Sequence, residues 1–455
     1  MFSGMKKMQK EIDMLNAPFL KKLLLFAIPI MLTGVLQILY NAADIIVVGQ
    51  FAGKEALAAV GSTSSLVNLI LNLFLGLAEG TGVITANLIG AGNREGQEKN
   101  VHTAMLLSVI CGFLVLLIGF FASKQFLMWM GSPDDVIDLS TLYLKIYFLG
   151  APASLVYNFG ASIVRSNGDT TRPFLILGAT GMINVVLNLI LVIVFHMDVA
   201  GVAIATIVAQ YISAVAILRI LVKLPNECRL DIKKLRIDKK SLEKILQIGI
   251  PAGIQGMMFS ISNVLIQSTV NSFGSVVIAG NSAATNADNI TWVCMNSFSQ
   301  AAVTFTSQNM GAKKYENVRK IYWRCMALAV AATIGIAAVM LVFQSQIMGL
   351  FSKDSDVILV GMERMKYILS GYFIVAIMDV TAGQIRGMGH SLATMFITLV
   401  GTCAFRVFWV YVIFPLNPVI TTVYLSYPVS WVITFIGLYI SYILYSKEIL
   451  KRNNG

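Results

Sequence analysis

Long apolar runs are the feature that most restricts the folds open to this chain. They lie near residues 23–49, 57–89, 100–122, 139–164, 173–196, 201–222, 246–272, 278–309, 322–346, 359–385, 392–414 and 420–446. About 20 predominantly apolar residues are enough to cross the roughly 30 Å hydrocarbon core of a bilayer. Lipid offers no partner for open backbone groups, and the runs are too long for barrel strands, so we expect helices. The sequence therefore predicts an all-α integral membrane protein with about twelve transmembrane helices.

The charged residues fit a lipid environment. Only 13% of the residues are charged, whereas 57% are hydrophobic, and soluble domains carry about 25% charged residues. Lysine and arginine gather in the two tails and in alternate loops, above all in the central loop around Lys233, Lys234 and Arg236. Basic residues concentrate on the cytoplasmic side of membrane proteins, so we expect both termini in the cytoplasm. Anionic lipid accounts for the net charge of +11, and we expect no nucleic-acid partner.

The two halves of the chain resemble each other. Ile28-Pro29 recurs as Ile250-Pro251, Gly90-Ala91 recurs as Gly311-Ala312, and Arg165 with Gly168 recurs as Arg386 with Gly389, at a nearly constant separation. An even number of spans in each half gives both halves the same direction through the membrane. The sequence thus predicts two six-helix bundles related by a parallel internal repeat, an arrangement found among transporters.

Five segments follow from this pattern. We predict a cytoplasmic N-terminal tail (1–22), an N-terminal bundle (23–222), a basic cytoplasmic linker (223–245), a C-terminal bundle (246–446) and a cytoplasmic C-terminal tail (447–455).

Motifs that would indicate catalysis or bound cofactors do not occur. The sequence has no phosphate-binding G-x-x-x-x-G-K-[ST] loop and no nucleophile elbow or zinc-binding histidine pair. The five cysteines and three histidines are scattered without metal-ligand spacing, so we interpret the cysteines as packing residues. We therefore expect neither an enzyme nor a cofactor, and an ion gradient is the remaining source of energy.

Several stretches resemble the multidrug and toxic compound extrusion (MATE) family. They include Ala27-Ile28-Pro29, Tyr40-Asn41-Ala42-Ala43-Asp44, Gly90-Ala91-Gly92-Asn93, Arg165-Ser166-Asn167-Gly168-Asp169, Ser307-Gln308-Asn309-Met310-Gly311-Ala312 and Arg386-Gly387-Met388-Gly389. The resemblance covers nearly the whole chain in order, and it points towards the DinF-like branch. It implies two bundles that open to alternate sides of the cell membrane. It also implies that a single chain exports bulky organic cations, including drugs, in exchange for H⁺ or Na⁺.

Asp44 is the strongest candidate for the coupling residue. It lies deep in the first apolar run, with no lysine or arginine within one helical turn. An ionisable group inside a membrane costs at least about 2.5–3.5 kcal/mol and is by default a functional candidate. Gln37, Tyr40 and Asn41 share its helical face, and we predict that they contact substrate. The structural alternative is a protonated, hydrogen-bonded packing carboxyl.

Polar residues in the other N-terminal spans complete the predicted ion site. Asn184 and Asn188 lie one turn apart, and amide oxygens suit either Na⁺ or a proton relay. The family resemblance adds Thr206 to the site and places Asn158 nearby, where it would contact substrate. We predict that Asp44, Asn184, Asn188 and Thr206 bind the cation, with Na⁺ at Asp44, Asn184 and Asn188 as one alternative and H⁺ as the other. Asparagine and threonine are otherwise common interhelical contacts worth about 0.6 kcal/mol each.

Two acids fall inside the C-terminal spans, Asp288 and Asp379. They are candidates for binding a cationic substrate, and pairing with Arg406 is the alternative, because buried charges are usually paired. The competing function for the whole chain is a flippase for lipid-linked saccharide or polysaccharide. Such proteins carry a strongly cationic cavity, whereas the charges inside the spans of this chain lean acidic, with Asp44, Asp288 and Asp379 against Arg406.

Overall fold

The computed structural model describes residues 11–130 and 134–453, and every regular element in these ranges is a helix. The chain divides into two compact units. The N-terminal unit comprises Leu32–Ile254 with the segment that ends at Asp13, and the C-terminal unit comprises Met14–Met31 and Gln255–Gly455. The division lies elsewhere than the predicted domain bounds, because α1 and α8 each contribute residues to both units.

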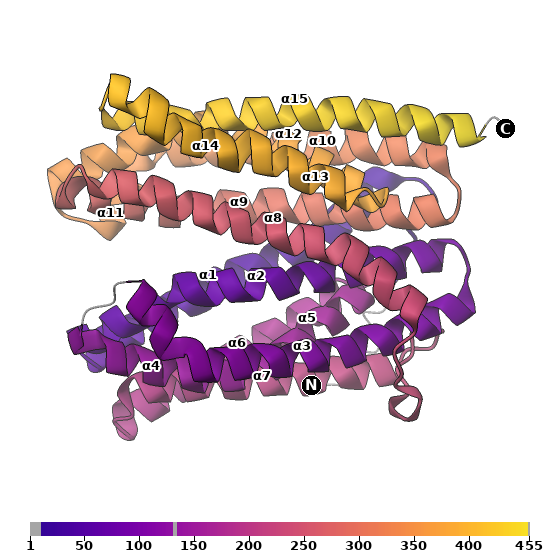
Figure 1. The fold of residues 1–455 in the computed structure, drawn as a ribbon, viewed down its shortest axis with the longest axis horizontal. Coiled ribbons are helices and arrows are strands. Elements are labelled where there is room, and N and C mark those ends of the chain that lie inside the picture. Colours follow the sequence, from indigo (N-terminus) through magenta and orange to yellow (C-terminus); the bar gives the residue numbers. More distant parts are fainter. Residues whose placement is uncertain (1–10, 131–133, 454–455) are drawn as a thin grey trace. The chain divides into compact units, whose positions relative to one another are not determined.

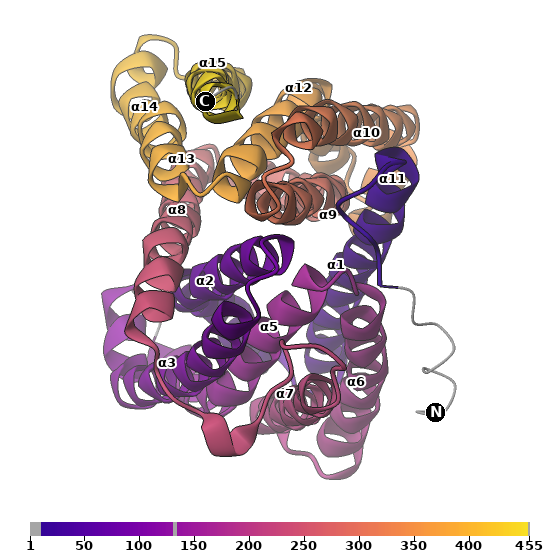
Figure 2. The same cartoon turned by 90° about the vertical axis from the view of Figure 1, so that its right-hand side faces the viewer.

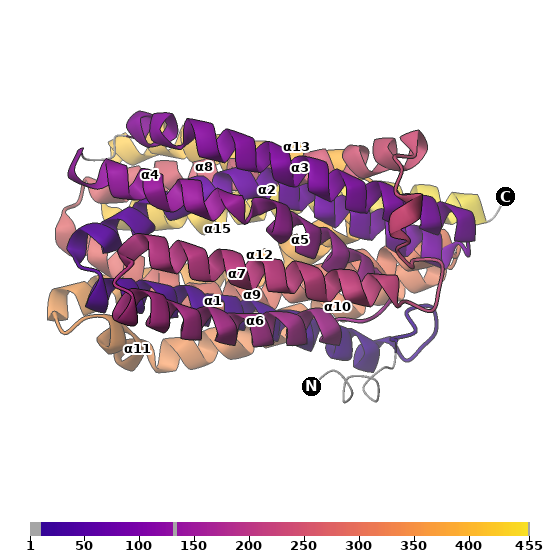
Figure 3. The same cartoon turned by 90° about the horizontal axis from the view of Figure 1, so that it is seen from below.

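The N-terminal unit contains most of the first half of the chain (Figure 1). Its elements are α1 (Phe19–Phe51) from Leu32 onwards, α2 (Lys54–Gly90), α3 (Arg94–Trp129), α4 (Asp134–Leu149), α5 (Ala151–Ser166), α6 (Thr171–Leu189), the π-helix η2 (Ile190–Val194), α7 (Asp198–Val222), the 3-10 helix η3 (Ile232–Lys234) and α8 (Lys239–Asn271) as far as Ile254. In this unit α6 and α7 run side by side (Figure 3).

A bend divides the fourth predicted span. Val136–Leu149 and Ala151–Ser166 meet at an angle of 46° around Gly150. Pro152 stands in the first turn of α5, where its missing N–H costs no hydrogen bond and its fixed φ favours a helix start. The predicted span at 139–164 therefore corresponds to a bent pair of helices.

Glycines bring α2 and the first part of α8 into close contact (Figure 2). A Cβ atom on Gly76 would lie 2.2 Å from the backbone nitrogen of Gly253, and one on Gly80 would lie 2.8 Å from that of Gly249. Small residues allow helix backbones to approach in this way within membranes.

The central linker is ordered by contacts with α3. The two ring nitrogens of His102 lie 2.6 Å from the carbonyl oxygen of Glu98 and 3.0 Å from that of Asp231, and Lys234 pairs with Glu98 at 2.9 Å. Asp238 then precedes α8 and accepts hydrogen bonds from the backbone N–H and hydroxyl of Ser241, both at 2.9 Å. These bonds lower the pKa of the Asp238 carboxyl. The predicted linker, 223–245, thus ends in helix from Lys239 onwards.

The C-terminal unit is centred on α12. Its further elements are α9 (Ser275–Gly311), α10 (Tyr315–Val342), α11 (Gln344–Phe351), α12 (Ser355–Gly387), α13 (Ser391–Thr398), η4 (Leu399–Ala404), α14 (Phe405–Phe408), η5 (Trp409–Ile413), η6 (Phe414–Leu416) and α15 (Ile420–Asn453). Helix α12 packs on α9, α10 and α15 (Figure 2). The start of α1 also belongs here, and Phe26 packs edge-on against Phe305 with centroids 5.4 Å apart.

Matching backbone geometry supports the internal repeat. Gly53 precedes α2 with φ 92°, and Gly274 precedes α9 with φ 94°. A positive φ is strained for residues other than glycine. Both halves therefore have a glycine in this conformation immediately before the corresponding helix. Helix α1 begins at Phe19 and α15 continues to Asn453, so each helix extends into a predicted tail. Residues 1–10 and 454–455 lie outside the described residues.

Length and composition identify most of the predicted spans. In the described ranges, ten helices are long and apolar enough to cross a membrane, or eleven if the bent pair of α4 and α5 is one span. Helix α9 corresponds to the predicted eighth span and is 37 residues long, but it carries many polar residues, such as Asn281, Asp288 and Ser297, that are buried inside the unit. About twelve spans in two bundles are consistent with this arrangement.

Candidate functional site

The N-terminal unit joins Asp44 of α1 to Asn188 of α6. The side-chain amide of Asn188 donates a hydrogen bond to Oδ1 of Asp44. Asn188 is 0% exposed and Asp44 is half-buried. A charge-assisted hydrogen bond of this kind is roughly twice as strong as a neutral one, so the ionised form of the carboxyl has a partner within the span.

The other two predicted ligands meet one turn away. The amide of Asn184 donates to the hydroxyl of Thr206 at 3.4 Å, and that hydroxyl donates in turn to the carbonyl of Val202 at 3.0 Å. Residues four apart on a helix lie on the same face, so Asn184 and Asn188 present two amides to one side of α6. Three helices, α1, α6 and α7, therefore contribute to one polar group.

Tyr40 fixes α1 against α6 one turn before Asp44. Its hydroxyl donates to the carbonyl of Gly178 at 2.9 Å. Its ring occupies the space above Gly181, where a Cβ atom would lie 1.8 Å from Cε2 of the ring. The absence of a side chain at Gly181 thus allows the tyrosine to reach α6.

One oxygen of this group is unsatisfied. Oδ1 of Asn188 is buried and has no hydrogen-bond partner among the described residues. Leaving a buried acceptor unpaired costs about 1–3 kcal/mol, and such groups in native proteins call for an explanation, an unplaced ion included. Carboxylate, amide and hydroxyl oxygens are the donors that hard cations prefer. The described residues contain no cluster of histidine, cysteine or acidic side chains of the kind that holds a transition metal.

The remaining predicted N-terminal residues have looser connections to this group. Gln37 and Asn41 are exposed on α1. The amide of Asn158 donates to the carbonyl of Ser154, one turn earlier on α5, at 2.8 Å, and no hydrogen bond in the described part of the chain links it to Asp44. Their contact with substrate stays a prediction.

Two tyrosines of α4 belong to the surroundings of Asp44 and were not predicted. Tyr143 and Tyr147 stack with centroids 5.9 Å apart, and both interact electrostatically with Asp44. The signal in the sequence was their spacing of four residues, which places both rings on one helical face.

Asp288 pairs with a different arginine from the one that the sequence suggested. It forms a buried ion pair with Arg364 of α12, and the two residues are 2% and 5% exposed. The alternative pairing of Asp288 with Arg406 was therefore wrong. The burial of this pair favours a structural role for Asp288 over contact with substrate.

Arg406 has neutral partners instead. Its guanidinium donates to the hydroxyl of Ser430 at 3.1 Å and to Oδ1 of Asn263 at 3.3 Å, and it lies 4.3 Å from the ring centroid of Tyr427. Such a cation–π contact is worth about 2 kcal/mol when desolvated. At Asp379, the other candidate acid, the backbone carbonyl accepts a hydrogen bond from Ser299 at 2.8 Å.

The candidate spans, the internal repeat and the buried contact of Asp44 place this chain in one class. It is a multi-pass membrane protein built from a duplicated helical unit, with a carboxyl group between its spans. The family model described as MatE matches the chain twice, at residues 29–190 and 251–412. The chain therefore belongs to the MATE family of transporters. The double match coincides with the internal repeat found in the sequence.

Known proteins are similar to this chain along most of their length, which supports the family assignment. A probable multidrug resistance protein of Bacillus subtilis is 29% identical over 404 residues, which cover 88% of each chain. A transporter of Shewanella oneidensis named as a FAD transporter is 24% identical and covers 77% of this chain and 78% of its own. The crystal structure of a MATE protein in the bent conformation superposes with a TM-score of 0.91 at 22% identity, covering 98% of this chain and 100% of the other.

Proposed function

We propose that the protein is a secondary active exporter of organic compounds, often cations, which it exchanges for H⁺ or Na⁺ by alternating access. The observation that carries the proposal is the Asp44–Asn188 contact inside a membrane span. A carboxyl at such a place is expensive to keep unless it serves a function. The names of the relatives support export, since they include multidrug resistance proteins and a multidrug export protein of Staphylococcus aureus.

The chemistry requires that one negative group serve two ligands in turn. With its carboxyl ionised, Asp44 holds the amide of Asn188 and can attract a cationic compound. A proton or Na⁺ at Asp44 removes that attraction and releases the compound. Net transport follows when the two occupants bind from opposite sides of the membrane, because a ligand shifts a conformational equilibrium only through its different affinity for the two states.

Either coupling ion fits the oxygen donors. A proton needs only the carboxyl of Asp44. Na⁺ would take Asp44 together with the unpaired Oδ1 of Asn188 and the side-chain oxygens of Asn184 and Thr206, all from α1, α6 and α7. The role of the ion is to neutralise Asp44, and the protein supplies oxygens on rigid helices to receive it.

The setting follows from the charge distribution. We place the protein in the cell membrane with both termini in the cytoplasm, because lysine and arginine gather in the tails and the central linker. We propose that it works as a monomer and that its partners are small organic molecules and the surrounding lipid.

Efflux from cells that lack their own pumps tests the proposal. Ethidium accumulation is compared between wild type and Asp44→Asn at equal membrane expression. The control is Asp198→Asn, the same chemical change at an exposed position of the same unit. We expect Asp44→Asn to abolish efflux, Asp198→Asn to leave it unchanged, and either a protonophore or a sodium ionophore to collapse it.

Two results would contradict the proposal. Full efflux by Asp44→Asn would remove the coupling role of the carboxyl. No efflux of ethidium or of other organic cations from well-expressed wild type would favour the flippase alternative.

A further inference from the structure

Two arginines are buried inside the C-terminal unit, and one of them has no counter-ion. Arg406 of α14 is 2% exposed and Arg364 of α12 is 5% exposed. A guanidinium group stays protonated in proteins, so burial cannot neutralise either side chain. Asp288 pairs with Arg364, whereas no ion pair in the described part of the chain includes Arg406. The two arginines and the aspartate therefore carry one positive charge in excess.

The two guanidinium groups belong to one enclosed cluster. Each interacts electrostatically with Tyr372 of α12 and with Tyr427 of α15. The guanidinium of Arg406 lies over the ring of Tyr427, 4.3 Å from its centroid. Because Asp288 comes from α9 and Asn263 from α8, the cluster is built by α8, α9, α12, α14 and α15.

Hydrogen-bond donors of this cluster lack acceptors. Nε of Arg364 is buried and has no partner among the described residues. Arg406 donates from Nε to Ser430 and from Nη1 to Asn263, and its Nη2 donates to no residue that the structure describes. A buried donor without an acceptor is costly, and an unplaced ion is one explanation for it. The side chain of Asn263 is exposed, so a solute can reach the guanidinium of Arg406 there.

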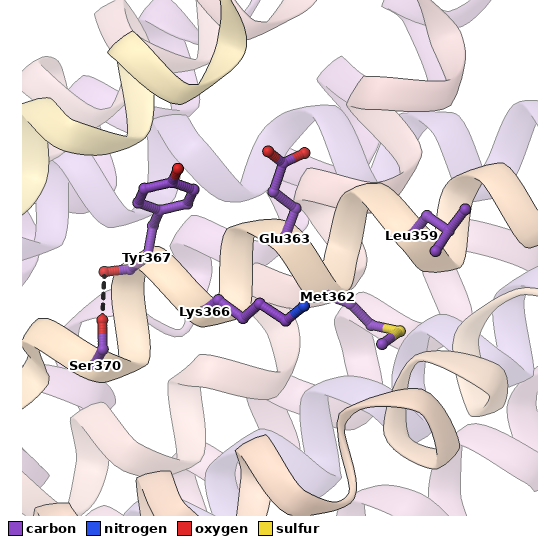
Figure 4. A pocket seen from close by; sticks show the side chains of 6 residues that line it. All are labelled: Leu359, Met362, Glu363, Lys366, Tyr367 and Ser370. Carbon is purple, nitrogen blue, oxygen red and sulfur yellow. Dashed lines mark hydrogen bonds between the residues drawn. The ribbon is translucent and has the colours of Figure 1, made fainter.

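Neighbouring charges of α12 do not supply the missing counter-ion. Glu363 and Lys366 line a hollow on the open face of the helix, and Figure 4 shows their side chains there. Arg364 stands on the buried face instead. No ion pair within the described ranges joins Glu363 to either arginine, so the excess positive charge remains.

The internal repeat relates Arg406 to a residue of the proposed cation site. One hydroxyl pair occurs in both units at a separation of 222 and 221 residues, as Thr180 with Ser213 at 2.9 Å and as Thr402 with Thr434 at 2.8 Å. Asn184 follows the first threonine of one pair by four residues, and Arg406 follows its counterpart by four residues. A position that offers a neutral ligand to a cation in the N-terminal unit thus carries a cationic side chain in the C-terminal unit. The charge of an ion that fits there is reversed.

We propose that the Arg364–Arg406 cluster is a binding site for one small monovalent anion, and that chloride is its occupant. The anion accepts hydrogen bonds from Nη2 of Arg406 and from the amide NH₂ of Asn263, and it offsets the excess positive charge. Buried charges are stable only when they are paired in this way. The anion is a resident ion of the C-terminal unit and not a cargo, so the inference goes beyond export and does not depend on Asp44.

Replacement of gluconate by chloride tests the site. The purified full-length protein in phosphatidylcholine nanodiscs is kept at constant sodium concentration and ionic strength. Thermal unfolding measures stabilisation of the folded state by a ligand, and broadening of the ³⁵Cl NMR line measures halide binding itself. We expect wild type to unfold at a higher temperature in chloride than in gluconate and to broaden the line. Neither cargo nor an ion gradient is present, so this assay and the efflux assay on Asp44→Asn can fail independently.

The variant Asn263→Asp supplies the missing negative charge from the protein. Its carboxylate would stand where Oδ1 of Asn263 now lies, 3.3 Å from Nη1 of Arg406. We expect this variant to unfold at the same temperature in chloride and in gluconate, and in gluconate to be more stable than wild type. The change adds no atom to the side chain except hydrogen, so it decides the question even if a larger substitution prevents folding.

The variant Arg406→Met removes the charge that attracts the anion. Loss of a charged contact weakens binding by about tenfold or more, so we expect the line broadening at a fixed chloride concentration to fall accordingly. We also expect higher stability than wild type in gluconate, because an apolar side chain replaces an unpaired buried charge. The control Arg319→Met removes an exposed charge from α10 of the same unit and should keep the full response to chloride.

Three outcomes would overturn the proposal. Wild type that behaves identically in chloride and gluconate has no such site. An undiminished chloride response in both Asn263→Asp and Arg406→Met would place the halide elsewhere on the protein. Loss of the response in phosphatidylglycerol nanodiscs would assign the cluster to a lipid phosphate.

Discussion

The substitution Gly181→Ala tests how α1 is fixed against α6. The added Cβ would lie 1.8 Å from Cε2 and 2.0 Å from Cζ of Tyr40, whereas carbon atoms in contact prefer about 3.5 Å or more. The ring must therefore retreat by roughly 1.5 Å or more. The 2.9 Å hydrogen bond from Tyr40 to the carbonyl of Gly178 cannot survive a movement of that size.

The expected change in stability combines three terms. Loss of the hydrogen bond costs about 1 kcal/mol, and overpacking adds about 1–3 kcal/mol. Alanine stabilises a helix by about 1 kcal/mol relative to glycine. The net effect of Gly181→Ala is destabilisation by about 1–3 kcal/mol. In a Tyr40→Ala background the clash is absent, so the same substitution should stabilise by about 1 kcal/mol.

A double-mutant cycle measures this coupling. Reversible unfolding in mixed micelles of dodecyl maltoside and sodium dodecyl sulfate gives the free energy of unfolding of each variant, and we expect a coupling energy of about 2–4 kcal/mol, the difference between the two backgrounds. Gly178→Ala is the matched control, because its Cβ would meet only Leu36 at an ordinary 3.6 Å. Equal effects of Gly181→Ala in the two backgrounds would show that Tyr40 does not pack against Gly181.

Two further predictions concern packing. Arg364→Gln leaves Asp288 buried without its partner, so we expect it to lower the free energy of unfolding by about 3–5 kcal/mol. The double change Asp288→Leu with Arg364→Met should recover most of that loss, and unfolding in mixed micelles decides between the two results. Gly76→Ala places a Cβ 2.2 Å from backbone atoms of Gly253, where no side chain can move away, so folded protein measured by size-exclusion chromatography should fall sharply. Gly335→Ala, which points into open space on α10, should preserve the yield, and equal yields would contradict the close contact.

The sequence predicted most of the spans because the lipid hydrocarbon core requires long apolar helices. Apolar length predicted the helices, and the recurrence of Ile28-Pro29 as Ile250-Pro251 predicted the repeat that the family model also finds. The bend at Gly150 was missed, because composition does not indicate how α4 and α5 turn. Helices α1 and α15 extend a few residues into the predicted tails, and the cytoplasmic position of the tails stays a prediction.

The site was only partly predictable. Helical spacing placed Asn184 and Asn188 on one face, and the structure joins Asn188 to Asp44. Arg364 was missed, because it stands between Glu363 and Lys366 and resembled part of an exposed charged segment. The helix places Arg364 on the buried face, and its partner on α9 is distant in sequence, so neither pattern nor spacing could identify the pair.

Coupled flux in proteoliposomes tests directly whether Asp44 couples export to the movement of an ion. Purified protein is reconstituted, ethidium is supplied on one side, and movement of H⁺ and of ²²Na⁺ in the opposite direction is followed with wild type and Asp44→Asn. We expect wild type to move one of the two ions only when ethidium is present, and Asp44→Asn, although folded, to move neither. Ethidium-dependent ion flux that persists in Asp44→Asn would contradict it.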